Sequence, residues 1–74
     1  MMPVEDFLVE FAEIVERDPS TLTLETELKD IGTWDSLSQV SFMAMLDEKF
    51  GKSVDPDRLD DAGTVGDLWR LATG

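Results

Sequence analysis

A serine near the middle of the chain is the residue best placed to do chemistry. Ser36 follows Gly32 and an irregular stretch, and it opens the most apolar of the predicted helical segments. The backbone N–H groups and the dipole at a helix N-terminus favour an anion, so a phosphoryl group on this hydroxyl would be well placed. Asp35 precedes Ser36, and both residue types are preferred helix caps. The sequence Asp35-Ser36-Leu37 alone therefore leaves open a structural cap and a modification site.

The residues missing from the chain exclude most kinds of intrinsic catalysis. The 74 residues include no cysteine and no histidine. Disulfides, thiolate zinc sites, a cysteine nucleophile and an imidazole base are therefore ruled out. A chain of this length forms one small domain, expected over residues 1–74, which is too small to enclose a substrate cavity. We expect a protein that is not an enzyme.

The charge is strongly acidic, with 17 Asp and Glu against six Lys and Arg and a formal net charge of −11. Such a polyanion repels nucleic acid and anionic membranes and attracts partners with basic patches. No apolar run approaches the roughly 20 residues of a membrane span, and the N-terminus lacks the pattern of a secretory signal. We expect a cytoplasmic monomer that inserts into no membrane and binds no nucleic acid.

The first part of the chain predicts one helix followed by a long loop. Residues 3–16 place apolar side chains at helical spacing, and Asp18-Pro19 stops the helix. In residues 20–34, Leu22 and Leu24 alternate with threonines as a strand would, but no second strand is predicted to pair with them. We therefore expect an ordered loop that its leucines attach to the core.

Residues 36–50 predict the second and most apolar helix, ending at Gly51. Its expected stripe consists of Leu37, Val40, Met43, Ala44, Leu46 and Phe50, widened by Phe42 and Met45. Met45 is expected at the edge of the helix, and Met43 is expected in the core. The breadth of this apolar surface exceeds what a one-sided surface helix needs.

The last third of the chain predicts a short helix and a longer one. Asp55 and Pro56 begin the short helix and Gly63 ends it. Thr64 begins the last helix and is spaced from Asp67 like a capping box. Glycine inside that helix lowers its propensity, so we expect this end to fray first. The predicted fold is all-α: a small four-helix bundle of three longer helices and one short helix, with a long first loop. The acidic segment 55–61 predicts no metal site, because it departs from the EF-hand pattern.

Four short segments of the sequence match one family pattern, and one of them contains Ser36. They are Gly32–Leu37, residues 46–51 at the end of the second helix, loop residues 26–32, and residues 64–68, which begin the last helix with Thr-Val. Together they resemble the acyl carrier protein family over nearly the whole chain. The resemblance implies a carrier whose Ser36, flanked by Asp35 and Leu37, receives 4′-phosphopantetheine from coenzyme A. A separate phosphopantetheinyl transferase makes this attachment with Mg²⁺. The thiol of the arm then holds an acyl or aminoacyl group as a thioester.

The resemblance also makes the second helix a docking face for partner enzymes. The expected docking residues are Leu37, Val40, Ser41, Ala44, Asp47 and Glu48, with Trp34 beside them. Trp34 has two interpretations, packing of the loop onto the bundle and contact with the arm or a partner. Many fatty-acid carriers have acids early on this helix, where this chain has Ser38, Gln39 and Ser41.

That departure predicts a specialised, free-standing acyl carrier protein of fatty acid, polyketide or other secondary biosynthesis. Its partners would be acyl-loading, acyl-transferring and condensing enzymes with basic docking patches. Two alternatives stay open. One is an aminoacyl or peptidyl carrier of the D-alanyl or nonribosomal peptide type. The other is an unmodified helical interaction module in which Ser36 is only a cap.

Overall fold

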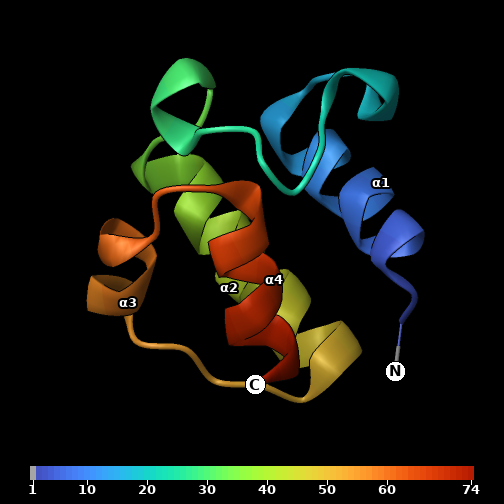
Figure 1. Cartoon of the computed structure of the whole chain (residues 1–74). Helices are drawn as coiled ribbons and strands as arrows, with labels where there is room; N and C mark the ends of the chain where they lie inside the picture. Colours follow the sequence, from blue (N-terminus) through green and yellow to red (C-terminus); the bar gives the residue numbers. More distant parts are fainter. Residues whose placement is uncertain (1) are drawn as a thin grey trace.

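The computed structural model describes residues 2–74, which form a bundle of four α-helices (Figure 1). The helices are α1 (Val4–Val15), α2 (Ser36–Phe50), α3 (Pro56–Asp61) and α4 (Val65–Thr73). The all-α prediction, with three longer helices and one short helix, is confirmed. No helix among residues 2–74 is both long enough and apolar enough to cross a bilayer.

The ends of the helices follow from local backbone chemistry. Helix α1 is followed by the C-cap residue Glu16, which adopts a left-handed conformation with φ of 57°. Helix α2 is likewise followed by Gly51, with φ of 63°. The predicted bounds of α2 are confirmed. The short helix α3 stops at Asp61 because Ala62 is already extended, so the prediction that it continues to Gly63 was wrong. Thr64 and Asp67 form the predicted capping box of α4.

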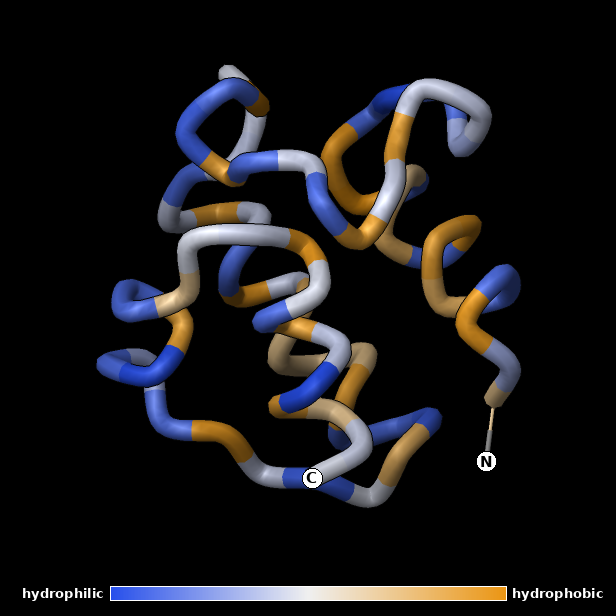
Figure 2. Tube along the Cα trace, in the orientation of Figure 1, coloured by the Kyte–Doolittle hydropathy of each residue, from blue (hydrophilic) through white to orange (hydrophobic). Residues whose placement is uncertain are grey.

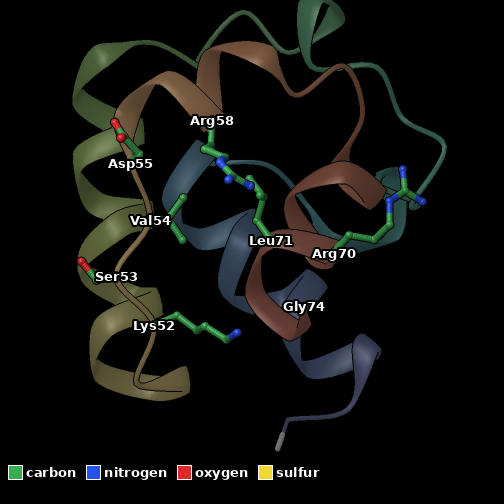
Figure 3. A pocket seen from close by; sticks show the side chains of 8 residues that line it. All are labelled: Lys52, Ser53, Val54, Asp55, Arg58, Arg70, Leu71 and Gly74. Atoms are coloured by element: carbon green, nitrogen blue, oxygen red, sulfur yellow. The ribbon is translucent and has the colours of Figure 1, made fainter.

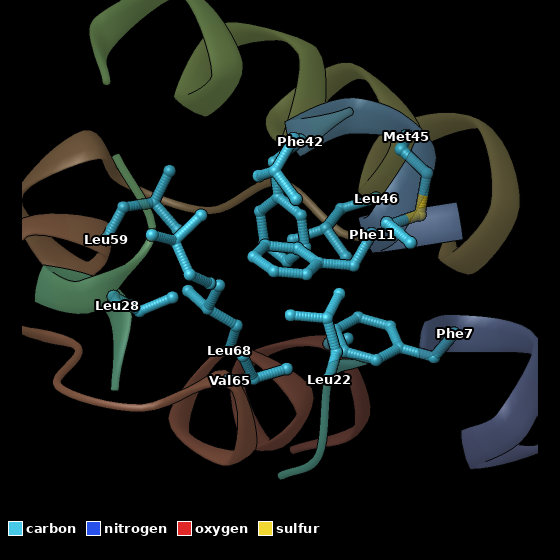
Figure 4. Packing of buried hydrophobic residues seen from close by; sticks show 14 residues of the cluster. Phe7, Phe11, Leu22, Leu28, Phe42, Met45, Leu46, Leu59, Val65 and Leu68 are labelled. Atoms are coloured by element: carbon cyan, nitrogen blue, oxygen red, sulfur yellow. The ribbon is translucent and has the colours of Figure 1, made fainter. Parts of the chain in front are cut away.

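The core is built from aromatic and aliphatic side chains of all four helices (Figure 4). Hydrophobic and hydrophilic residues alternate along α1 (Figure 2). The buried residues recur at helical spacing, so they form one face that meets the core. Phe7 and Phe11 on that face contact Phe42 of α2 edge to face, with ring centroids 6.0 Å apart in both pairs. Burial of each such ring contributes about 1.5–3 kcal/mol, so these rings anchor α1 to α2.

The apolar stripe predicted for α2 was partly wrong. Leu37 and Val40 are 77% and 58% exposed, and Ala44 is exposed as well. The buried face consists instead of Ser38, Phe42, Met45 and Leu46. Met45 therefore lies in the core and not at the edge, whereas Met43 is only partly buried against it. The helix carries two apolar faces, of which only one meets the bundle.

The long first loop is ordered, and its aliphatic side chains attach it to the core as predicted. It contains two short 3₁₀ turns, Pro19–Thr21 and Leu28–Asp30, and it buries Leu22, Leu28 and Ile31. Its backbone also pairs with the start of α4. The N–H of Val65 donates to the Thr26 carbonyl at 3.0 Å, and that of Gly66 donates to the Leu24 carbonyl at 2.8 Å. This pairing fixes the loop that leads to Ser36.

Gly66 belongs to this pairing and is not simply a weak position in α4. A Cβ atom at this position would lie 2.9 Å from the Leu24 carbonyl oxygen. We expect Gly66→Ala to lower the free energy of unfolding by about 1–3 kcal/mol, because backbone crowding outweighs the helix propensity gained. Gly32→Ala is the control, since a Cβ there meets nothing within 4 Å. Thermal unfolding measures both variants, and equal melting temperatures would contradict the crowding argument.

Candidate functional site

The start of α2 is closed by a reciprocal pair of hydrogen bonds. Asp35 is the N-cap, and its carboxylate accepts a hydrogen bond from the Ser38 backbone N–H at 3.0 Å. In return, the Asp35 backbone N–H donates to the Ser38 hydroxyl oxygen at 2.7 Å. The Ser38 hydroxyl in turn donates to the Thr33 carbonyl at 2.9 Å. The cap is therefore complete without any contribution from the side chain of Ser36.

Ser36 is the first residue of α2 and is exposed. Its hydroxyl makes no hydrogen bond to any other residue within 2–74. The interpretation of Ser36 as a structural cap is thus wrong, because Asp35 has that role. A free hydroxyl lies at the positive end of a 15-residue helix, where the dipole stabilises an anion.

The other two serines of α2 lack this combination of features. Ser38 is 6% exposed, and its hydroxyl is engaged in the cap. Ser41 is exposed but lies in the second turn, away from the free N–H groups of the helix start. Among these serines, Ser36 alone is both accessible and at the helix N-terminus.

The loop before Ser36 is held against the bundle at two neighbouring residues. The Thr33 hydroxyl donates to the Val15 carbonyl at the end of α1. Next to it, the half-buried Trp34 ring lies 5.5 Å from Phe11 and 5.8 Å from Phe42, measured between ring centroids. The packing interpretation of Trp34 is therefore confirmed. These contacts fix where the α2 terminus, and with it Ser36, faces solvent.

A shallow hollow of about 400 Å³ lies between the first loop, the first turn of α2 and α3. Leu28, Ile31, Leu59 and Ala62 supply aliphatic atoms to its lining. At its edge, the Gln39 amide donates to the Asp60 carboxylate at 3.3 Å and connects α2 to α3. Residues 2–74 contain no group of three or more side chains arranged to hold a metal ion.

Comparison with protein families decides what this arrangement is. The family described as the phosphopantetheine attachment site matches residues 5–71. The chain belongs to this family. It is a carrier domain that holds 4′-phosphopantetheine covalently and catalyses no reaction itself. Phosphopantetheinyl transferases modify such carrier domains, and loading and modifying enzymes bind them. A comparison with curated proteins gave no match.

The residues predicted to dock partners lie together on the outer side of the carrier's second helix. All six, namely Leu37, Val40, Ser41, Ala44, Asp47 and Glu48, are exposed. Ser41, Ala44 and Glu48 also line a groove of about 440 Å³ between α1 and α2. Glu10, Glu13 and Glu16 of α1 line the same groove. These acids of α1 therefore border the predicted docking face of α2.

The cap carboxylate of the carrier is stabilised in its ionised form. The hydrogen bond from the Ser38 backbone N–H is the largest influence and holds the pKa of Asp35 below its ordinary value of 3.8, while desolvation acts in the opposite direction. Hydrogen bonds from the Gly63 and Thr64 backbone likewise lower the pKa of Asp67. Asp35 therefore carries a negative charge beside Ser36 at neutral pH, and the helix N-terminus offsets it.

The stability of the carrier should fall in acid in a way that depends on Asp35. Because its pKa is lower in the folded state, the ionised carboxylate stabilises the fold above about pH 3.8. This contribution is lost as the pH falls through the folded-state pKa. In thermal unfolding between about pH 5 and pH 2, Asp35→Asn should lose less stability than the wild type, because Asn caps without titrating. Parallel curves for the two proteins would show that the cap charge contributes nothing.

Proposed function

We propose that Ser36 is the attachment residue and that this domain carries an acyl group as a thioester on its 4′-phosphopantetheine. The observation that carries this proposal is the free, exposed Ser36 hydroxyl at the start of α2. The residues around it fit a phosphodiester, because Asp35 and Ser38 complete the cap without Ser36 and the helix terminus favours an anion. The bound arm supplies the thiol that this cysteine-free chain lacks.

The chain's own part in attachment is to present one nucleophilic oxygen. The Ser36 Oγ atom forms a bond to the phosphorus that bears the pantetheine part of coenzyme A, and the bond to the nucleotide part breaks. The proton of the hydroxyl passes to a base of the transferase. Asp35 and Leu37 flank the site and orient Ser36 through the backbone of the first helical turn.

An acyl cargo is supported by the hollow next to the α2 start, whose lining includes the buried aliphatic residues Leu28, Ile31 and Leu59. The neutral residues Gln39 and Ser41 support a specialised pathway of fatty acid or polyketide type, because they leave the early turns of α2 without acids. A single carrier unit over residues 1–74 is supported by the one core that all four helices share.

We propose that loading, acyl-transferring and condensing enzymes with basic patches dock on the outer face of α2. Leu37 and Val40, both more than half exposed, support an apolar centre for this surface. Asp47 and Glu48 support a charged rim. Trp34 precedes this surface in the chain, and its ring packs toward the core on Phe11.

Loading assays test the cargo class after attachment at Ser36 has been shown by mass spectrometry. The modified protein is incubated with fatty-acid-adenylating and amino-acid-adenylating enzymes, and thioester formation is followed by mass. We expect acyl loading. Aminoacyl loading without acyl loading would overturn the acyl proposal and identify an aminoacyl or peptidyl carrier, the alternative to it.

A further inference from the structure

A second hollow, of about 490 Å³, lies between the segment that joins α2 to α3, helix α3 and the end of α4 (Figure 3). Three of the six basic residues of the chain line it, namely Lys52, Arg58 and Arg70. They come from three different segments, so only the fold brings them together. This concentration of cations is unexpected on a chain with a net charge of −11.

Two of these cations face the hollow without an acidic partner. Arg58 extends toward Leu71, Lys52 extends from the opposite end of the lining, and neither forms an ion pair within residues 2–74 (Figure 3). Arg70 pairs with Asp67, and its guanidinium points away. Asp55, the acidic residue of the lining, also points away (Figure 3). Its carboxylate caps α3 through the Asp57 backbone N–H.

The space between the two cations has apolar walls. Val54 and Leu71 line it, and both are partly buried against the core. A guanidinium binds a carboxylate through two parallel hydrogen bonds, and an ammonium group binds a second carboxylate as a point charge. An aliphatic side chain between two carboxylates would complement Val54 and Leu71.

We propose that this hollow is a docking site for a short acidic and apolar segment of a partner protein. Charge complementarity carries the proposal, since the occupant meets two unpaired cations on a molecule that otherwise repels acidic chains. Ser36 and Lys52 lie at opposite ends of α2, which is roughly 20 Å long at 1.5 Å per residue. A partner held here leaves the α2 start free. That last point rests on attachment at Ser36, whereas binding in the hollow does not.

Binding can be measured on the full chain without phosphopantetheine, so the result is independent of the proposed attachment. The probe is a short synthetic peptide of alternating glutamate and leucine, titrated into ¹⁵N-labelled protein at low salt. We expect chemical-shift changes centred on Lys52, Val54, Arg58 and Leu71. The same peptide with glutamine in place of glutamate separates charge from apolar contact and should bind weakly.

Two double variants with the same change in net charge locate the site. Lys52→Glu with Arg58→Glu should weaken peptide binding about tenfold, because two ion pairs are lost and repulsion replaces them. Arg17→Glu with Lys29→Glu changes cations outside the hollow and should weaken binding less than about twofold. Lys52→Gln with Arg58→Gln repeats the test with a smaller perturbation if the reversed variant unfolds. Equal losses in the two charge-reversed variants, or no localised shifts in the wild type, would overturn the proposal.

Discussion

Wild-type protein incubated with coenzyme A, Mg²⁺ and a broad-specificity phosphopantetheinyl transferase should gain one phosphopantetheine, and Ser36→Ala should gain none. The reason is geometric. Ser36 offers the exposed, unbonded hydroxyl at the α2 start, where the helix dipole favours the new phosphodiester. Intact-protein mass spectrometry measures the result. The effect should be all or none, because the substitution removes the oxygen atom that forms the proposed bond.

The neighbouring serines provide matched controls for this result. Ser41→Ala changes an exposed serine on the same helix and should leave modification complete. Ser38→Ala removes the hydroxyl of the capping box and should lower the free energy of unfolding by about 1 kcal/mol without abolishing modification. Circular dichroism should show the helical fold of Ser36→Ala unchanged, since its side chain makes no hydrogen bond within residues 2–74. A modified Ser36→Ala protein or an inert wild type would refute attachment at this residue.

The position of Ser36 could be predicted from sequence because the signals for it are local. A helix start, its caps and a terminating glycine act over a few residues, so the bounds of α2 follow from Asp35 and Gly51. The assignment of cap and free hydroxyl between Asp35 and Ser36 could not be predicted, because both residue types cap well. The Ser38 hydroxyl decides it by closing the capping box around Asp35.

The buried face of α2 could not be predicted because two apolar faces lie on one helix. Leu37 and Val40 satisfy the same spacing as a core stripe, yet the bundle buries Phe42, Met45 and Leu46. The periodicity of a sequence indicates that a helix face is apolar, but it does not indicate which part of the protein covers that face. The exposed pair is therefore the informative exception, since a domain gains no stability from exposing large aliphatic side chains.

The pairing between the first loop and α4 could not be predicted from the sequence, for a different reason. Leu22 and Leu24 alternate with threonines as a strand would, but the sequence predicts no second strand. The partner of this segment is the backbone at the start of a helix, where Val65 and Gly66 donate to Thr26 and Leu24. Free N–H groups at helix starts donate to such carbonyl groups without any strand pattern. Gly66 was the signal, because a glycine inside a helix indicates close approach of another backbone.

The second large effect expected is on partner docking, and it should divide between apolar and charged contacts. Leu37→Ala should lower kcat/KM for a cognate loading enzyme by about tenfold, as expected for loss of a large exposed anchor at an interface centre. Asp47→Lys with Glu48→Lys should lower it by a similar factor at low salt and by less at high salt, because exposed charges are screened. Both variants are assayed after modification, so that attachment does not limit the rate.

Controls keep the two contributions apart. Glu5→Lys with Glu25→Lys makes the same change in net charge at exposed positions outside α2, and should have little effect at either salt concentration. If that control loses as much activity as the α2 reversal, the overall field guides partners and no acidic rim on α2 exists. If charge reversal on α2 abolishes loading at both salt concentrations while Leu37→Ala is silent, acids alone determine docking and the apolar centre is wrong. If neither change matters, partners dock elsewhere, and the loop at Trp34 is the next surface to test.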